Sequence, residues 1–303
     1  MILVAGGTGT LGREVVARLR SSGQQVRVLT RTAARAAGLD AGVAVGDVRD
    51  AAALPGAMNG CSAVVSAVHG FLGGRGADPA AVDAQGNANL MRAACEAGVG
   101  QFVLVSVLDA RADHPMSLHR AKYAAEQHLH ASGLSWTVLR PAAFAETWAG
   151  VIGAKLPAGG PALVFGRGTN PINFVSALDV AALAERAITD PAMRGQAIDI
   201  PGPGNLTMVQ FARLLGAARI RHVPRGALRL LATAAAPLAP ALARQAGAAL
   251  IMDTTSMAAD SSALHGRFPD ITWHQIPEPT SQSRPRRPAG DTTGQSPHQG
   301  RNT

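Results

Sequence analysis

The fold is decided near the amino terminus, where residues 2–12 read ILVAGGTGTLG. Four apolar residues, as in a short buried strand, lead directly into a turn with glycine at positions 6, 9 and 12. Leu11, Val15 and Leu19 then recur every four residues, as they would on one face of a helix. The stretch therefore predicts a strand, a tight turn and a helix, which is the opening unit of a parallel α/β fold.

Each glycine of this turn has a physical role. Gly6 permits the tight turn, Gly9 lets a pyrophosphate approach the backbone, and Gly12 lets the helix pack closely on the strand. The unpaired N–H groups at the start of the helix favour a bound phosphate. We therefore expect a dinucleotide here, and a ligand-free structural turn is the alternative. The cofactor-binding residues expected in the turn are Gly6, Thr8, Gly9, Thr10, Leu11 and Gly12.

Short apolar strands continue to alternate with helical segments. Further strands are expected near residues 26–29, 43–45, 63–68, 102–105, 136–139 and 197–200. Helices are expected near residues 117–132 and 176–188, and from the N-cap Thr207 to Leu215. Parallel strands joined by right-handed crossovers give a sheet that is covered on both faces. The predicted fold class is α/β, a doubly wound parallel Rossmann sheet with helices on both faces and a smaller carboxy-terminal substrate lobe.

Composition divides the chain into three parts. Residues 1–142, completed by about 171–200, are expected to form the dinucleotide-binding domain. Residues 143–170, rich in Gly and Pro after position 150, and residues 201–274 are expected to form loops and a small substrate-binding lobe. Residues 275–303 are dominated by Pro, Ser, Gln, Thr, Gly and Arg, so we expect a disordered tail.

The Ala- and Leu-rich stretch 226–250 resembles a membrane span at first sight. Its uncharged run between Arg229 and Arg244 has only 14 residues, whereas a span needs about 20, and Pro237 and Pro240 interrupt it. The sequence therefore predicts no transmembrane span, and buried or cleft-lining helices in this stretch.

The remaining composition excludes several classes of protein. An apolar fraction of 47% with 16% charged residues is typical of a globular chain. Only two cysteines are present, Cys61 and Cys95, without metal-ligand spacing, and no basic segment precedes the first strand. We therefore expect no metal site, no secretory signal and a cytoplasmic location.

Basic residues outnumber acidic ones by 28 to 20, yet only Lys122 and Lys155 are lysines. This arginine preference is typical of a coding bias, and no aromatic residues interleave the basic ones, so a nucleic-acid partner is not expected. A lysine that survives such a bias can mark a place where arginine cannot serve, because an ammonium can lose its proton and a guanidinium cannot. Chance survival is the alternative.

The end of the second strand indicates which dinucleotide is bound. An NAD site would place Asp or Glu about 20 residues past the glycines, to hold the ribose 2′-hydroxyl. This chain has Leu29, Thr30 and Arg31 there instead. A guanidinium pairs with phosphate, so the sequence favours NADP(H) over NAD(H), with Arg31 at the 2′-phosphate and Arg13 and Arg35 as possible helpers. The alternative is that Arg31 is an ordinary surface charge.

Further motifs complete a resemblance to a known family. They are GDV at 46–48, LRP at 139–141, FVSALDVA at 174–181 and PGNLT at 203–207. With the glycine turn, they resemble the short-chain dehydrogenase/reductase superfamily, and more narrowly its atypical, NmrA-like branch of NAD(P)H-binding proteins. The resemblance covers residues 1–215 well and is fainter to residue 274.

The resemblance implies roles for residues at the strand ends. Asp47 would face the adenine amino group and Val48 would flank the ring, with a loop-capping role for Asp47 as the alternative. Ser66 and Ala67 would lie along the ribose and nicotinamide side. The residues from Pro141 to Phe144 would lie near the nicotinamide.

The catalytic pair of the family is incomplete in this chain. Its dehydrogenases carry Tyr-x-x-x-Lys, in which the tyrosine exchanges a proton with substrate and the lysine binds the ribose. Lys122 matches the lysine, but Leu118 stands at the tyrosine position. Tyr123 is about 100° away around the helix and is not assigned the missing role. The family's serine corresponds to either Ser106 or Val107.

Two functions fit these residues. In the first, the chain is an NADPH-dependent oxidoreductase whose proton comes from another group. Lys122 is the first candidate, because a desolvated lysine can titrate near neutrality, although it would otherwise serve only to bind the cofactor ribose. His119, at i−3 on the same helix face, and His69, after the fourth strand, are the further candidates. In the second, the chain binds NADP(H) without turnover, as a redox sensor, regulatory or assembly protein.

The expected substrate is small and apolar, such as a carbonyl, an enone or a quinone. Residues 143–170 and 205–255 would line its site, and they are dominated by Ala, Leu, Gly and aromatic side chains. Phe144, Trp148 and Phe165 are candidate lining residues, with ordinary core packing as the alternative. The sequence gives no prediction of oligomeric state.

Overall fold

The computed structural model describes residues 1–153 and 161–276. All but two residues of the predicted tail lie outside this part of the chain, so the tail prediction is not addressed.

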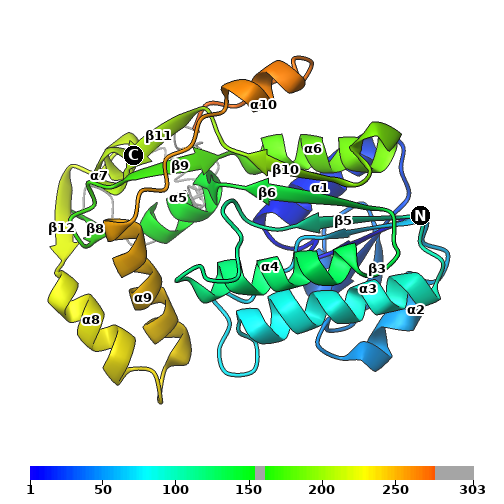
Figure 1. Cartoon of the computed structure of the whole chain (residues 1–303), viewed down its shortest axis with the longest axis horizontal. Coiled ribbons are helices and arrows are strands. Elements are labelled where there is room, and N and C mark those ends of the chain that lie inside the picture. The colour runs from blue at the N-terminus through cyan, green and yellow to red at the C-terminus, as the bar shows by residue number, and fades with distance from the viewer. Residues whose placement is uncertain (154–160, 277–303) are drawn as a thin grey trace, which may run out of the picture.

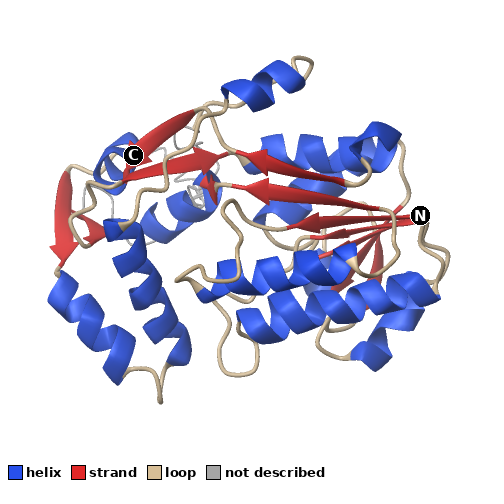
Figure 2. Cartoon of the chain, in the orientation of Figure 1, coloured by secondary structure: helices blue, strands red, loops and turns tan. Residues whose placement is uncertain are grey.

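Seven parallel strands form the central sheet and position the site (Figures 1 and 2). The order across the sheet is β10-β6-β5-β4-β1-β2-β3. Strand β1 lies between β2 and β4, because the chain first adds strands on one side of β1 and later on the other. Ligands of such sheets bind at the carboxyl ends of the strands, at the point where the direction of the connections changes. The strands are β1 (Ile2–Ala5), β2 (Val26–Thr30), β3 (Gly42–Val45), β4 (Ala63–Ser66), β5 (Gln101–Val105), β6 (Trp136–Pro141) and β10 (Gln196–Ile200).

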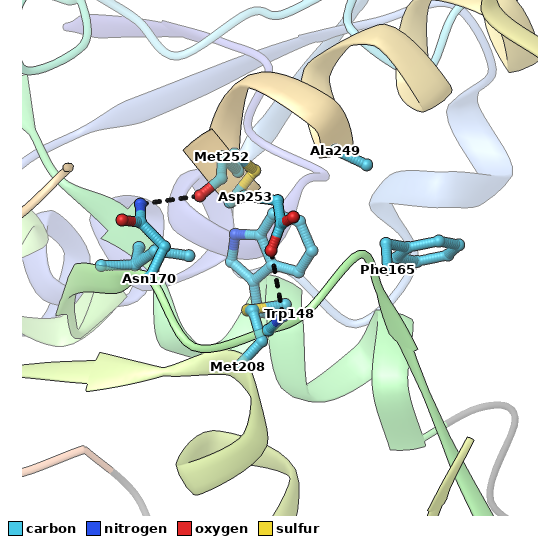
Figure 3. A pocket seen from close by; sticks show the side chains of 9 residues that line it. Trp148, Phe165, Asn170, Met208, Ala249, Met252 and Asp253 are labelled. Atoms are coloured by element: carbon cyan, nitrogen blue, oxygen red, sulfur yellow. Dashed lines mark hydrogen bonds between the residues drawn. The ribbon is translucent and has the colours of Figure 1, made fainter. Parts of the chain in front are cut away.

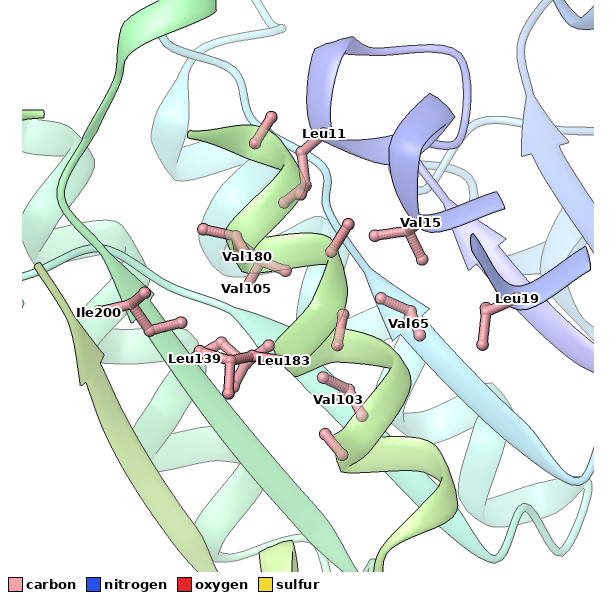
Figure 4. Close-up of a cluster of buried hydrophobic side chains, with 14 of the residues drawn as sticks. Leu11, Val15, Leu19, Val65, Val103, Val105, Leu139, Val180, Leu183 and Ile200 are labelled. Atoms are coloured by element: carbon pink, nitrogen blue, oxygen red, sulfur yellow. The ribbon is translucent and has the colours of Figure 1, made fainter. Parts of the chain in front are cut away.

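Helices cover both faces of this sheet, which confirms the predicted fold class. On one face, α1 (Thr10–Ser21) and α6 (Ala177–Thr189) bury Leu11, Val15, Leu19, Val180 and Leu183 against the strands (Figure 4). On the other face, α2 (Leu54–Met58), α3 (Asn87–Glu96) and α4 (Ser117–His130) enclose a second apolar core. Short helical turns link these elements: η1 (Ala33–Ala36), η2 (Ala51–Ala53), η3 (Ala80–Gly86) and η4 (Pro191–Met193).

A smaller lobe lies beyond the carboxyl ends of β6 and β10. It contains a sheet of β11 (Gly204–Thr207), β9 (Pro171–Val175) and β7 (Ala143–Phe144), and a parallel pair of β8 (Pro161–Phe165) and β12 (Arg219–Val223). Its helices are α5 (Ala145–Gly153), α7 (Met208–Leu214), α8 (Arg225–Ala234), α9 (Pro240–Thr254) and α10 (Ser262–Arg267). Within residues 171–200, β9 belongs to this lobe, whereas α6 and β10 belong to the central sheet.

Two helix starts follow directly from the sequence. Thr207 accepts a hydrogen bond from the Gln210 N–H, and the Gln210 side chain accepts one from the Thr207 N–H, so the predicted N-cap is a full capping box. Ser176 caps α6 by accepting from the Leu178 N–H.

One prediction for the lobe is wrong and another is refined. Residues 150–170, expected as loop or small lobe, include the end of α5 and the strand β8, whose hydrogen-bonding partner β12 is distant in sequence. The prediction of buried or cleft-lining helices fails for α8, in which only Leu228 is buried. Among the described residues, no helix is long and apolar enough to cross a membrane.

Candidate functional site

The glycine turn joins β1 to α1 with the geometry that its sequence predicts. Gly6 has φ +81°, and a Cβ there would lie 2.7 Å from the carbonyl oxygen of Ala67. A Cβ on Gly12 would lie 2.1 Å from the carbonyl oxygen of Gly6, so only glycine lets α1 approach the turn this closely. A Cβ on Gly9 would meet only the Gly6 oxygen, at an ordinary 3.4 Å. The fold therefore requires glycine at positions 6 and 12, but not at position 9.

The first turn of α1 is open to a ligand. No side chain caps it and no acidic residue lies in it. Thr8 is half-buried, and Gly9 and Thr10 are exposed. Leu11 instead points into the apolar core, so only its backbone could contact a cofactor. Free N–H groups without a nearby carboxylate make this end of the helix favourable for an anion.

Arg31 lies at the carboxyl end of β2 and is exposed. Within the described chain, no hydrogen bond or ion pair holds its guanidinium, although its charge contributes to lowering the pKa of Asp47. Arg13 donates to the carbonyl oxygens of Thr8 and Arg35, 3.3 and 2.8 Å away, and so ties α1 to the turn after β2. The Arg13 side chain is therefore engaged by backbone oxygens, whereas the guanidinium of Arg31 stays available for an anion.

Asp47 follows β3 and is engaged by Arg49, a residue that sequence reasoning missed. The Arg49 side chain donates to both carboxylate oxygens, and its hydrogen bonds are the main cause that lowers the pKa of Asp47. A carboxylate has further lone pairs, so Asp47 could still accept a hydrogen bond from an adenine amino group. Val48 is buried, and its carbonyl oxygen accepts from Asn89 Nδ2 at 3.0 Å.

The end of β4 lies against the glycine turn. Ser66 is fully buried and donates to Asn87 Oδ1 at 2.6 Å, so its hydroxyl is occupied on the α3 side of the sheet. Ala67 is half-buried, and its carbonyl oxygen is the atom that a Cβ on Gly6 would strike. The loop after β4 is thereby held directly beside the predicted phosphate site.

Lys122 reaches this loop from α4. It is only 4% exposed, and its Nζ donates to the carbonyl oxygens of Val68 and Val105, at 2.7 and 2.9 Å. Nζ also lies 3.0 Å from Oδ1 of Asp83, a fully buried carboxylate on η3. This contact is an ion pair outside hydrogen-bond geometry, and Oδ1 has no hydrogen-bond partner. Three oxygen atoms therefore surround the lysine ammonium.

Asp83 and Lys122 together fix the backbone on either side of His69. Asp83 Oδ2 accepts from the Gly70 N–H at 2.7 Å, while Lys122 holds the Val68 carbonyl. His69 itself is exposed, yet desolvation by the surrounding protein lowers its pKa, with Lys122 acting in the same direction and Asp83 opposing.

His119, the other histidine proposed from sequence, lies in a different environment. It is buried and stacks on His114 with ring centroids 3.8 Å apart, and its Nδ1 has no hydrogen-bond partner. Burial, with a smaller contribution from His114, lowers the pKa of His119 to about 3. At neutral pH His119 is therefore a neutral imidazole, and it cannot act as an acid in the way that an imidazolium does.

The serine and tyrosine positions of the resemblance have other partners. Ser106 is buried and donates to Glu126. Arg140 donates to both oxygens of the same Glu126, which is fully buried. Leu118 and Tyr123 are both half-buried on α4. Ser106 thus belongs to a buried network between β5, α4 and β6.

Pro141 and Phe144 lie where β6 passes into the small lobe. The carbonyl oxygen of Pro141 accepts from the Leu108 N–H at 2.8 Å, which ties the end of β6 to the segment after β5. Phe144 is half-buried and packs against the core beneath α1 and α6. Both residues therefore lie at the carboxyl edge of the central sheet.

The aromatic residues Trp148 and Phe165 line a small cavity of about 20 Å³ within the lobe (Figure 3). This volume accommodates about one water molecule, so the cavity is too small for a substrate. Asp253, also on its wall, accepts from the N–H groups of Arg167 and Gly168 and from Arg225. These contacts stabilise the lobe. No cluster of three or more potential metal ligands occurs within residues 1–153 and 161–276.

Comparison with known proteins identifies the family of the chain. A family model described as NAD(P)H-binding matches residues 6–191. The chain is 34% identical over 234 residues to the NAD(P)H azoreductase of Xenophilus azovorans, covering 76% of this chain and 78% of that protein. It is 31% identical over 243 residues to the Photosystem II assembly factor Ycf39 of Synechocystis sp., covering 76% of this chain and 72% of that protein.

Solved structures show the same fold at lower identity. The NADPH complex of the Escherichia coli NADPH-dependent quinone oxidoreductase QOR2 matches with a TM-score of 0.71 and 22% identity, over 91% of this chain and 97% of that chain. The Citrobacter sp. triphenylmethane reductase with NADP(H) matches with a TM-score of 0.69 and 20% identity, over 88% and 94%. The chain belongs to the NAD(P)H-binding, NmrA-like branch of the atypical short-chain dehydrogenase/reductase superfamily, a branch that includes NAD(P)H-dependent oxidoreductases.

Proposed function

We propose that the protein is an NADPH-dependent reductase of a small apolar carbonyl, enone or quinone-like acceptor. The observation that carries the proposal is the convergence at one sheet edge of the open glycine turn and the loop that bears His69. Ala67 abuts Gly6, and the next residue of this loop is held by Lys122. A bound dinucleotide would therefore have its phosphates at the turn and its reactive end beside an exposed imidazole.

The residues at the turn fit the cofactor. Position 9 is glycine although no neighbouring atom demands it, which leaves the backbone accessible to a pyrophosphate. The unpaired guanidinium of Arg31 fits the 2′-phosphate that distinguishes NADPH from NADH. When bound, the nicotinamide supplies a hydride. The protein's own task is then to orient the ring, exclude water and deliver one proton to the reduced acceptor.

We assign that proton to His69. The ammonium of Lys122 is already surrounded by three oxygen atoms, so it serves to hold the loop and the cofactor side of the site. His119 has a pKa of about 3 and is buried, which makes it unsuited to donate a proton near neutrality. His69 is exposed, and its lowered pKa makes its imidazolium a stronger acid than a free histidine.

Stopped-flow oxidation of bound NADPH tests the proposal. The acceptor panel would contain quinones, azo dyes, enones and imines, because the relatives reported above include an NAD(P)H azoreductase. We expect at least one class to accelerate the loss of nicotinamide absorbance, and NADH to be a poorer donor. Tight NADPH binding without acceleration by any acceptor would contradict a reductase.

The second candidate function is an NADP(H)-binding regulatory or assembly protein without turnover. Leu118 has no proton to give at the position where family dehydrogenases carry tyrosine, and a similar protein is named as an assembly factor. This candidate predicts tight cofactor binding and no acceptor-dependent oxidation. The same stopped-flow experiment therefore separates the two functions.

A further inference from the structure

Exposed leucines gather on the hairpin formed by α8 and α9 and on the loop that lies beside it. Leu238, in the connection between the two helices, is 90% exposed, and Leu230 on α8 is 66% exposed. Half of the ten large apolar residues exposed in the described chain belong to this surface. We call it the leucine surface, and it consists of Leu72, Leu230, Leu231, Leu238 and Leu242.

Two arginines attach the loop of residues 70–77 to the hairpin. Arg75 donates to the carbonyl oxygen of Pro237 at 3.0 Å. Arg244, on α9, donates to the carbonyl oxygen of Phe71 at 2.9 Å and also to that of Gly73. Leu72 is therefore held beside the hairpin, although more than 150 residues separate it from α8 in sequence. Figure 1 shows the hairpin extending away from the central sheet.

The leucine surface contributes little to the stability of the lobe. Only Leu228 of α8 is buried, and neither α8 nor the connection after it supplies a residue to the three apolar cores. Exposed leucines that stabilise nothing in the monomer are typical of a docking surface.

The charge around the leucine surface indicates which kind of partner it can bind. Arg225, at the start of α8, is paired with Asp253, but residues 226–252 contain Arg229 and Arg244 and no Asp or Glu. Arg229 forms no ion pair among the described residues, and Arg75 and Arg244 use backbone carbonyls, which leave their charges uncompensated. A partner that matches this surface therefore offers an apolar region for the leucines and negatively charged groups for the arginines.

We propose that the leucine surface docks on an anionic lipid bilayer. Leucines that enter the headgroup boundary would bury apolar area, while the arginines contact lipid phosphates. The docking is peripheral, because α8 has 10 residues and α9 has 15, too few for either helix to span a bilayer. A second copy of the chain docked face to face would bring two basic surfaces together, which is unfavourable.

Vesicle co-sedimentation of the full chain tests the inference. We expect binding to vesicles that mix phosphatidylcholine with phosphatidylglycerol, weak binding to phosphatidylcholine alone, and loss of binding at high salt. Leu238→Ser should weaken partitioning about tenfold, because an apolar side chain no longer enters the bilayer. Arg229→Ser should weaken it about fivefold, as expected for one basic residue at an anionic surface.

Matched controls lie elsewhere on the molecule. Leu178→Ser removes a leucine that is 40% exposed on α6, and Arg194→Ser removes an exposed arginine after η4. Neither should change vesicle binding by more than about twofold. Equal effects of control and surface variants would overturn the inference. So would a lipid-independent dimer in analytical ultracentrifugation that Leu238→Ser dissociates, since the surface would then bind a second copy.

Discussion

Asp83 and Lys122 form a buried ion pair whose two members hold the same loop. Nζ of Lys122 lies 3.0 Å from Asp83 Oδ1, and the two side chains bind the backbone of Val68 and Gly70, on either side of His69. The lysine that matches the family motif is thus tied to an acidic partner on η3. This arrangement makes the pair a support for the loop, and it leaves His69 exposed between the two held residues.

Removing the acidic partner should destabilise the fold. Asp83→Asn can keep a hydrogen bond to the Gly70 N–H but leaves Lys122 as an uncompensated buried charge, so we expect the free energy of unfolding to fall by about 3 kcal/mol. Urea denaturation measures this loss. Asp40→Asn is the matched control, because Asp40 pairs with Arg20 on the surface and should cost less than about 1 kcal/mol. Similar small losses in both variants would contradict a structural ion pair.

Substitutions at two glycines of the first turn should affect stability and cofactor binding separately. Gly12→Ala places a Cβ 2.1 Å from the Gly6 carbonyl oxygen, so α1 must move and the melting temperature should fall by several degrees. Gly9→Ala meets only an ordinary contact, so its melting temperature should stay near that of the parent chain. NADPH binding, measured by fluorescence, should nevertheless weaken in Gly9→Ala. Unchanged affinity in that variant would show that no phosphate approaches position 9.

Arg31 should decide the preference between the two dinucleotides. Arg31→Ala removes an unpaired guanidinium, and the loss of a charge-assisted contact should raise the Kd for NADPH about 10- to 100-fold. The Kd for NADH should hardly change, because NADH has no 2′-phosphate. Arg194→Ala, which removes an exposed arginine after η4, provides a control away from the turn. An equal loss of affinity for both dinucleotides would remove Arg31 from the 2′-phosphate site.

The buried His119 should make stability depend on pH. Its folded pKa of about 3 lies below the unfolded value of 6.5, so the unfolded chain takes up the proton first as pH falls. The stability supplied by the neutral ring is therefore complete above pH 6.5 and is lost toward pH 3, at up to roughly 1.4 kcal/mol per pH unit. His114, whose pKa is also lowered mainly by burial, acts in the same direction.

Urea titrations between pH 7 and pH 4 measure this dependence. His119→Gln should remove the contribution of about one proton from the slope of the free energy of unfolding against pH. This holds whatever the variant does to the absolute free energy of unfolding. Gln127→Ala, at an exposed and uncharged position on the same helix, should leave the slope unchanged. A parental slope retained in His119→Gln would mean that another group takes up the proton.

The parts of the fold that were predictable are those encoded by local patterns. Residues 2–12 contain a strand, a turn and a helix start, and the strand-and-helix alternation up to residue 200 follows from short-range apolar periodicity. The pair β8 and β12 was missed because neither strand is marked by its own residues, and each is stabilised by the other across the lobe. Exposure of α8 was missed because composition does not tell which helix face meets the core.

The site was predictable only where a motif carries it. The glycine turn, Arg31 and Lys122 stand at recognisable positions. Asp83 lies 39 residues before Lys122, on the π-helical segment η3, and nothing in the sequence indicates that the two side chains meet. Arg49 was missed for a different reason: it lies two residues after Asp47 in sequence, but a surface arginine gives no signal of the carboxylate that it binds.

The central claim is that this chain reduces an acceptor with hydride from NADPH and a proton from His69. The most direct test is the pH dependence of single-turnover NADPH oxidation by the best acceptor, in the parent chain and in His69→Gln. Because the imidazolium is the acid, the parental rate should fall as pH rises through an apparent pKa below 6.5, and His69→Gln should be slow and independent of pH in this range. A parental pH profile and rate in His69→Gln would contradict the account.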